Sequence, residues 1–211
     1  MRGTIVVRVL VVLALASAVV ATTLAEAQQR PWSPRGRAST QVDGCFRADG
    51  AYEGGKWIDV DYGRPILRGR RNFWGSGADY GKTMLLGAPV WRLGADQTTR
   101  FRTETDLMFG DQRLRAGEYS LFAETREREW TLIFSTWGVK QDYREADPDA
   151  LWGAYGYTPE KDVIRTTMTV EAIGASTDQL TIGFVDMSQQ GGLFMVWWDD
   201  QIATTPFTVA H

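Results

Sequence analysis

Apolar and polar residues alternate along most of this chain, and that alternation is the feature that most limits its fold. In residues 56–62 every second side chain from Ile58 is apolar. The same period of two recurs at 119–124, 130–135, 164–170 and 180–185. A period of two places successive side chains on opposite faces of a β-strand. The pattern predicts an all-β protein.

Turn signals and sparse helix signals narrow the fold class further. A short helical turn is predicted at 147–153, with Asp147 as its cap and Pro148 at its first position. Many short strands with little helix favour an antiparallel β-sandwich or a jelly-roll-like fold. Residues 193–198 are apolar on both faces and predict a central strand. Residues 202–209 contain Pro206 and predict an edge strand.

A long segment rich in glycine and arginine interrupts the strands at 63–88. It exceeds the length of an ordinary hairpin loop. Loops of this size in compact domains are usually functional or disordered. We therefore expect a binding cleft beneath residues 63–97.

The N-terminus has the features of a signal peptide over residues 1–27. Arg2 and Arg8 precede an uncharged, mostly apolar run at 9–25, and Ala25-Glu26-Ala27 matches a signal peptidase site. The alternative is an uncleaved anchor, but seventeen uncharged residues fall short of the roughly 20 that span a bilayer core. The sequence predicts export to the periplasm or the extracellular space.

The mature chain is expected to carry a flexible leader at 28–37 and one β-sandwich domain at 38–211. Cleavage would remove two arginines and one glutamate, leaving 21 basic and 25 acidic residues and a net charge of −4. That charge gives no electrostatic basis for binding nucleic acid or an anionic membrane.

Cys45 is the single cysteine, so no internal disulfide can form. We expect Cys45 to be a small buried hydrophobe, with a reactive thiol as the alternative.

Seven short strings, in order along nearly the whole mature chain, resemble the bacterial family of domain of unknown function 2911. They are SPRGRAS at 33–39, VDYGRP at 60–65, YGK at 80–82, VWRLGA at 90–95, AGEYSLF at 116–122, WTLI at 130–133 and WGAY at 152–155. The resemblance implies an exported or lipid-anchored bacterial protein, and it supplies no activity, cofactor or catalytic residue. The chain departs from the common family pattern Gly-Ala-Asn-Glu, because Asp96 and Gln97 follow Gly94 and Ala95.

Residue types exclude several kinds of chemistry. The only histidine is the last residue, His211, which argues against a Ser-His-Asp or Cys-His site and against a zinc site. The sequence also lacks the common nucleotide and hydrolase fingerprints. We therefore predict no cofactor and no metal. Asp59 and Asp61 are weak catalytic candidates, since they lie on one strand face about 6.5–7 Å apart, near the spacing of an inverting glycosidase pair.

The strings at 61–65 and 91–96 each place an arginine, an aromatic residue and an acid beside glycine where a strand meets a loop. Arginine offers a planar fork for carboxylates or sugar hydroxyls, and tryptophan offers a stacking face. The alternative is a set of structural ion pairs that pin the long loop. The ligand-binding candidates are Asp61, Arg64, Trp91, Arg92, Asp96, Trp152 and Tyr155.

The sequence favours a non-catalytic domain that binds a small molecule or carbohydrate or associates with the envelope. A carboxylate-dependent carbohydrate hydrolase or lyase and a purely structural envelope protein are the alternatives.

The first testable prediction concerns export. Mass spectrometry of the mature protein should find its N-terminus at or within a few residues of Gln28, because signal peptidase cleaves after small residues such as Ala27. Recovery of an intact chain that still begins at Met1 would contradict the prediction.

Overall fold

The computed structural model describes residues 31–210, in which strands account for 55% of the residues and helices for 6%. The all-β prediction is confirmed. The predicted signal peptide, 1–27, lies outside the described residues, as do residues 28–30 of the predicted leader and His211. Within 31–210, no helix is long and apolar enough to cross a membrane.

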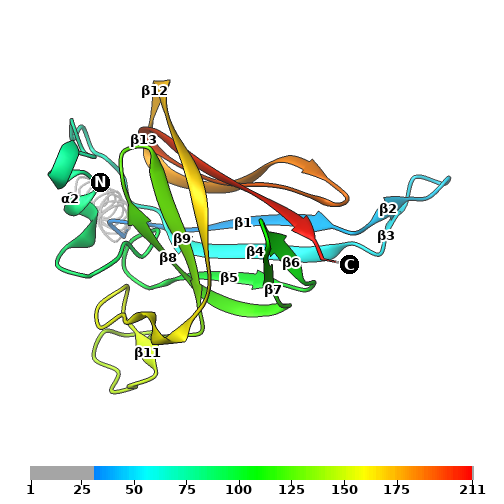
Figure 1. The fold of residues 1–211 in the computed structure, drawn as a ribbon, viewed down its shortest axis with the longest axis horizontal. Coiled ribbons are helices and arrows are strands. Elements are labelled where there is room, and N and C mark those ends of the chain that lie inside the picture. Colours follow the sequence, from blue (N-terminus) through cyan, green and yellow to red (C-terminus); the bar gives the residue numbers. More distant parts are fainter. Residues whose placement is uncertain (1–30, 211) are drawn as a thin grey trace, which may run out of the picture. The chain divides into compact units, whose positions relative to one another are not determined.

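Short strands dominate the chain and only brief helical turns interrupt them (Figure 1). In chain order the elements are β1 (Arg35–Val42), β2 (Cys45–Phe46), β3 (Tyr52–Glu53), β4 (Lys56–Gly63), η1 (Gly77–Asp79), α2 (Lys82–Leu85), β5 (Thr99–Thr103), β6 (Leu107–Phe109), β7 (Gln112–Leu114), β8 (Gly117–Thr125), β9 (Glu129–Ser135), β10 (Gly138–Val139), β11 (Ala150–Leu151), η2 (Pro159–Lys161), β12 (Asp162–Ser188) and β13 (Gly191–Val209).

Among the described residues, the largest sheet has nine strands in the order β1-β4-β5-β8-β9-β12-β13-β6-β7. All of its pairs are antiparallel. The predicted hairpin between 119–124 and 130–135 is confirmed, because β8 pairs with β9 from Ser120 opposite Ser135 to Thr125 opposite Trp130. The same regular alternation places Ile58, Val60 and Tyr62 of β4 on the buried face.

The β12–β13 ribbon is much longer than the other strand pairs, and it bends sharply (Figure 1). Its register shifts twice between Ala172 and Thr181, and Asp199 of β13 has a φ of 53°. Beyond the bend, the tip of the ribbon meets two other segments. The carbonyl oxygens of Gln189 and Gln190 accept hydrogen bonds, each of 2.7 Å, from the amides of Asp43 and Val209. One hydrogen-bonded sheet thus folds over itself into a sandwich-like arrangement.

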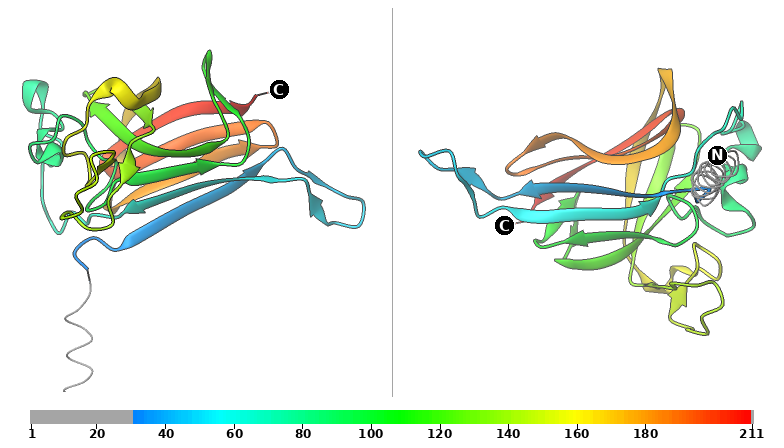
Figure 2. Two further views of the ribbon diagram at one scale, coloured as in Figure 1. Left: turned by 90° about the horizontal axis from the view of Figure 1, so that it is seen from below. Right: turned by 180° about the vertical axis from the view of Figure 1, so that it is seen from behind.

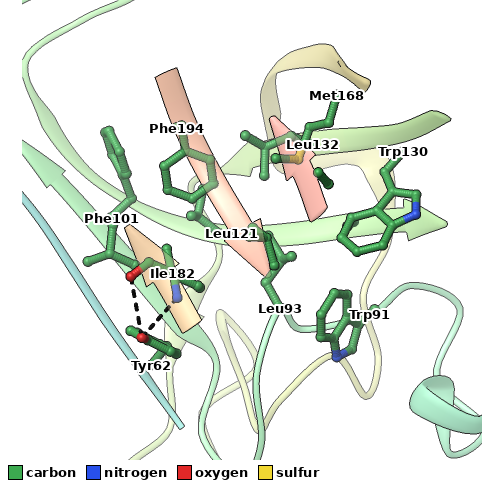
Figure 3. Close-up of a cluster of buried hydrophobic side chains, with 14 of the residues drawn as sticks. Tyr62, Trp91, Leu93, Phe101, Leu121, Trp130, Leu132, Met168, Ile182 and Phe194 are labelled. Atoms are coloured by element: carbon green, nitrogen blue, oxygen red, sulfur yellow. Dashed lines mark hydrogen bonds between the residues drawn. The ribbon is translucent and has the colours of Figure 1, made fainter. Parts of the chain in front are cut away.

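The main core lies between the folded halves of this sheet (Figure 3). Phe194, Val196 and Trp198 form the inward row of β13, and each is at most 3% exposed. Tyr62 of β4 ties the two halves together, because its hydroxyl donates to the carbonyl of Ile182 (3.4 Å) and accepts from the amide of the same residue (2.9 Å). β13 lies between β12 and β6 in the sheet order, but within residues 31–210 the stretch 193–198 pairs with β12 alone, because β6 meets β13 only at Thr208 and Val209. The predicted central position therefore holds for β13 as a whole and not for 193–198.

The long segment after β4 packs into this core. Its buried members include Phe73, Trp74, Tyr80 and Met84. The Trp74 indole nitrogen donates to the carbonyl of Trp198 over 3.1 Å. The glycine- and arginine-rich segment therefore carries aromatic side chains that fill one region of the interior.

A smaller apolar cluster covers the outer face of β8 and β9. Phe122 and Ile133 of those strands contact residues that come from the loops on either side, including Trp137, Leu151 and Tyr157. The helical turn predicted at 147–153 is wrong, because Ala150–Leu151 forms β11, which pairs in parallel with β10. Burial of both β11 side chains against the sheet outweighs the local capping signal.

Two predicted boundaries also require correction. The leader predicted at 28–37 ends too late, since Arg35 is already paired with Gly63 in the ladder between β1 and β4. The edge strand predicted at 202–209 starts too late, because it is the end of β13, which begins at Gly191 and pairs with β12 as far as Thr204. Pro206 is tolerated there because β6 pairs only with Thr208 and Val209.

Cys45 is exposed rather than buried. It begins β2, and β2 and β3 form a small hairpin that extends past the ends of β1 and β4 (Figure 2). Phe46 and Tyr52 pack edge-to-face on this hairpin with ring centroids 5.0 Å apart, and Phe46 is 74% exposed. A two-strand hairpin has no second layer to cover its side chains.

The close approach of Gly63 to the backbone of Ala95 generates the second prediction. A Cβ atom at position 63 would lie 2.1 Å from the Ala95 carbonyl oxygen. Because that neighbour is backbone, Gly63→Ala should destabilise the protein by about 1–3 kcal/mol or more. Urea denaturation measures the loss. The control is Gly174→Ala, where the added Cβ meets nothing within 4 Å; equal stability of the two variants would contradict the prediction.

Candidate functional site

The four charged residues Asp61, Arg64, Arg92 and Asp96 come from segments that touch, but their side chains do not form one cluster. Gly63 packs directly on Ala95, which brings the end of β4 beside the 94–96 turn. Within residues 31–210, no ion pair joins any two of the four. The predicted Asp–Arg struts are therefore absent from this part of the chain, and each arginine has a different partner.

Arg64 joins the two halves of the sheet. Its Nε donates to the carbonyl oxygen of Leu180 in β12 over 3.0 Å, and its terminal nitrogen lies 3.4 Å from the Thr181 hydroxyl. Its aliphatic stem covers Gly36 of β1, where a Cβ would lie 2.2 Å from the Arg64 Cδ. These contacts give Arg64 a structural role.

Arg92 is only 6% exposed and braces two loops. One terminal nitrogen donates to the backbone carbonyl of Asp96 over 2.8 Å. The guanidinium lies against Gly153, where a Cβ would be 2.4 Å from nitrogen, and 5.2 Å from the centroid of the Tyr155 ring. Arg92 thus holds the 94–96 turn against the 153–155 turn. Little of the Arg92 side chain is left exposed to contact a solute.

The predicted aromatic platform is not assembled as one surface. Trp91 is 1% exposed and stacks on Trp198 with ring centroids 6.2 Å apart, so it offers no face to a solute. Trp152 contacts Tyr143 edge-to-face at 6.4 Å. Tyr155 is 45% exposed and donates its hydroxyl proton to the carbonyl of Leu86 over 3.1 Å.

Asp59 is buried and fully engaged. One of its oxygens accepts hydrogen bonds from Arg37 (2.8 Å) and from the Ser39 hydroxyl (2.5 Å). Burial acts to raise the pKa of Asp59, but these two hydrogen bonds outweigh it and hold the pKa below its ordinary value of 3.8. A general acid must carry a proton at the working pH. Asp59 is therefore a poor acid, which weakens the predicted Asp59–Asp61 catalytic pair.

Asp61 lines a cavity of about 360 Å³ on the outer face of the sheet. The cavity lies over β1, β4, β5 and β8, beside the loop that follows β10. Its lining residues are Arg35, Asp61, Gln97, Thr98, Arg100, Glu118, Val139 and Gln141. Strand register explains the gathering, because Asp61 stands directly opposite Arg100 on β5 and Arg37 on β1.

Most polar groups of this cavity bind one another. Arg100 donates from Nε to Glu118 over 3.0 Å and from a terminal nitrogen to the Ser120 hydroxyl over 2.9 Å. The Gln97 amide donates to the side-chain oxygen of Gln141 over 3.1 Å. These bonds fix the shape of the wall.

Asp61 and Arg35 differ from the rest of the wall. Across the part of the chain that the structure describes, neither side chain forms a hydrogen bond or an ion pair, although both line the cavity. They are diagonal neighbours on β1 and β4, because Arg35 pairs with Gly63. Diagonal positions lie about 7–8 Å apart. The cavity thus presents a carboxylate and a guanidinium that make no hydrogen bond within residues 31–210, at a separation that a small molecule spans, although the charge of Asp61 also acts on Arg37.

The sequence identified Asp61 among these residues and missed most of the others, including Arg35, Arg100 and Glu118. The sequence does contain a signal for these residues, because each occupies a position that the alternating pattern of its strand assigns to the outward face. Their convergence depends on the successive pairing of β1 with β4, β4 with β5 and β5 with β8, which brings together residues as far apart in the chain as Arg35 and Glu118, 83 positions. A local pattern does not encode these pairings.

A polar network elsewhere on the sheet joins β8 and β12. Arg165 contacts Glu124 and donates to Asp162 over 2.8 Å, and Tyr157 donates to the same Asp162 oxygen over 2.7 Å. Burial, followed by the hydrogen bond to Asp162 and then the charge of Asp162, raises the pKa of the Tyr157 phenol, so it remains a hydrogen-bond donor. The network anchors the small outer cluster to the sheet. Among residues 31–210, no group of three or more His, Cys, Asp or Glu side chains is placed to hold a metal ion.

Comparison with protein families identifies the chain. The model of a family described as a protein of unknown function, DUF2911, matches residues 48–207. The chain belongs to the DUF2911 family. No curated protein and no solved structure matched it. Membership in DUF2911 confirms the predicted family; six of the seven strings lie within the matched residues, and the string at 33–39 lies outside them. The family description assigns no activity to the cavity.

The third prediction tests the role of Asp59. Because its pKa is lower in the folded state, its contribution to stability is present above the unfolded value near 3.8 and is lost as the pH falls through the folded value. Asp59→Asn should lower the melting temperature at pH 7 by roughly 3–8 °C. The difference from the parent protein should shrink between pH 5 and pH 2.

Asp61→Asn is the matched control on the same strand face. It removes a carboxylate that has no hydrogen bond within residues 31–210 and should change the melting temperature little. Melting curves across this pH range measure both variants. A pH-independent loss for Asp59→Asn would show that its carboxylate charge is not the stabilising element.

Proposed function

We propose that this DUF2911 protein is an exported, non-catalytic binding protein that takes up a small polar solute without net charge. The observation that carries the proposal is the pair Asp61 and Arg35, whose side chains form no hydrogen bond or ion pair within residues 31–210, in a cavity where most other polar groups are hydrogen-bonded. A free carboxylate accepts hydrogen bonds from hydroxyl or ammonium groups, and a free guanidinium donates to oxygens. The cavity volume, about 360 Å³, lies within the usual range for ligand sites, roughly 300–1,000 Å³.

The charge balance of the wall selects the class of solute. Two arginines, Arg35 and Arg100, face two carboxylates, Asp61 and Glu118. A wall with no net charge gives no advantage to an anion or a cation. A hydroxyl-rich molecule of sugar size, or a zwitterion, satisfies both free groups at once.

The geometry disfavours the hydrolase alternative. Asp61 and Glu118 stand on β4 and β8, which flank β5. Glu118 is engaged by Arg100, and Asp59 is held in its charged form by Arg37 and Ser39. Neither carboxylate is placed to act as the acid that a catalytic pair with Asp61 needs. The favoured reading is therefore binding.

The fourth prediction tests this cavity by calorimetry. Titration with glucose, maltose, N-acetylglucosamine, serine and glutamine should reveal saturable binding for at least one of them. Asp61→Asn and Arg35→Ala should each weaken that binding by about 10- to 100-fold, the value of a charged hydrogen bond. Both side chains are exposed or partly exposed, so the fold should persist.

Asp111→Asn serves as the matched control, because Asp111 lies in the turn between β6 and β7 and does not line the cavity. It should bind as the parent does. If none of the five titrants binds, or if Asp61→Asn binds as tightly as the parent, the proposal fails. Complete absence of binding would favour the structural envelope role.

A further inference from the structure

A second cavity, of about 620 Å³, shares no lining residue with the first. It lies between the segment that follows β4, the turn joining β8 to β9, and the bend of the β12–β13 ribbon. Its lining residues are Gly75, Tyr80, Glu127, Arg128, Thr169, Val170, Ala172 and Gln201. The cavity exists because β12 changes register after Ala172, so that the ribbon turns away and leaves Tyr80 and Val170 at an opening.

The floor of this cavity is rigid. The Tyr80 ring stacks on Trp74 with centroids 5.7 Å apart and planes at 18°, and Trp74 in turn lies 5.0 Å from Trp130. The next residue, Gly81, packs so closely on Thr125 of β8 that a Cβ would lie 2.1 Å from its hydroxyl oxygen. The position of the Tyr80 hydroxyl is thus fixed before any ligand arrives.

The Tyr80 hydroxyl has an unused hydrogen-bonding capacity. Its oxygen lies 3.4 Å from the Trp130 indole nitrogen, which donates to it. Within residues 31–210, no acceptor receives the phenolic proton. Tyr80 lines the cavity and its phenol feels the charge of Glu127 in the same wall, so this proton can be offered to a group inside the cavity.

The surrounding charges indicate the kind of acceptor that fits. Burial, and then Asp200 and Glu127, raise the pKa of Tyr80 to about 12, so the phenol keeps its proton at physiological pH. The same two carboxylates oppose an anion beside the hydroxyl. Of the other lining residues, Gly75, Val170 and Ala172 are apolar, and Glu127 and Arg128 bring one charge of each sign, so the wall favours neither an anion nor a cation.

We infer that this cavity binds a small uncharged molecule with an apolar body and a carbonyl- or ether-type oxygen that accepts a hydrogen bond from Tyr80. The apolar side chains at Val170 and Ala172 contribute affinity, and the Tyr80 hydroxyl orients the ligand. The inference is independent of the Asp61 cavity and does not rest on its function.

Prodan, an uncharged naphthalene with a dimethylamino group and a ketone, is a suitable probe because its emission responds to polarity. Titration with prodan should give a saturable, single-site, blue-shifted signal. Tyr80→Phe removes only the donor and should weaken binding about 2- to 10-fold, as expected for a neutral hydrogen bond. Ala172→Trp should block the cavity and abolish the signal, and because Ala172 is exposed the larger side chain does not enter the core.

Two control variants isolate the effect. Tyr143→Phe makes the same chemical change at a tyrosine that is 58% exposed and does not line the cavity, and Asp61→Asn alters the other cavity. Both should bind prodan as the parent protein does. Absence of saturable binding, or parental affinity in either Tyr80→Phe or Ala172→Trp, would overturn the inference.

Discussion

The bend in the β12–β13 ribbon is the constraint on which the rest of the structure depends. A single antiparallel sheet buries only one face, and it needs a second layer to cover that face. The bend supplies this layer from the same chain, because it carries Phe194, Val196 and Trp198 over the apolar face of β4, β5 and β8. Backbone hydrogen bonds at the ribbon tip, from Asp43 and Val209, then hold the layers in place.

Both cavities are consequences of how this folded sheet is closed. The bend leaves an opening beside Val170 and Ala172, which Tyr80 and its aromatic neighbours fill only in part. On the outer face, the cavity of Asp61 lies next to the small apolar cluster that covers β8 and β9. The wall of the Asp61 cavity contains no member of the main core, whereas Tyr80 and Val170 line the other cavity and belong to that core.

Local patterns predicted the strands well, because alternation at Ile58 and its neighbours depends only on which face is buried. They failed where distant segments decide the outcome. The exposure of Cys45 follows from a hairpin that no layer covers, and the burial of Trp91 follows from its stacking on Trp198, 107 residues away. The same residue types that suggest a binding platform also build an aromatic core, and only the tertiary arrangement distinguishes the two.

The strings that carry the family resemblance are largely explained by close contacts between them. Gly36 fits under Arg64, Gly63 fits against Ala95, and Gly153 fits against Arg92, so four strings interlock at positions where any larger side chain would collide. The two residues that follow Ala95, Asp96 and Gln97, are not part of these close contacts. Asp96 has a φ of 61°, a conformation that Asn and Asp adopt more readily than most residues, which accounts for either residue at that position.

Position 97 has no such backbone requirement, and its side chain lines the cavity of Asp61. The glutamate of the common family pattern would add a third carboxylate to that wall and make it net negative. Gln97 instead leaves the two arginines and two carboxylates in balance. The departure of this chain from the family pattern at position 97 therefore changes the charge of the cavity wall, and it does not fall where it would change the fold.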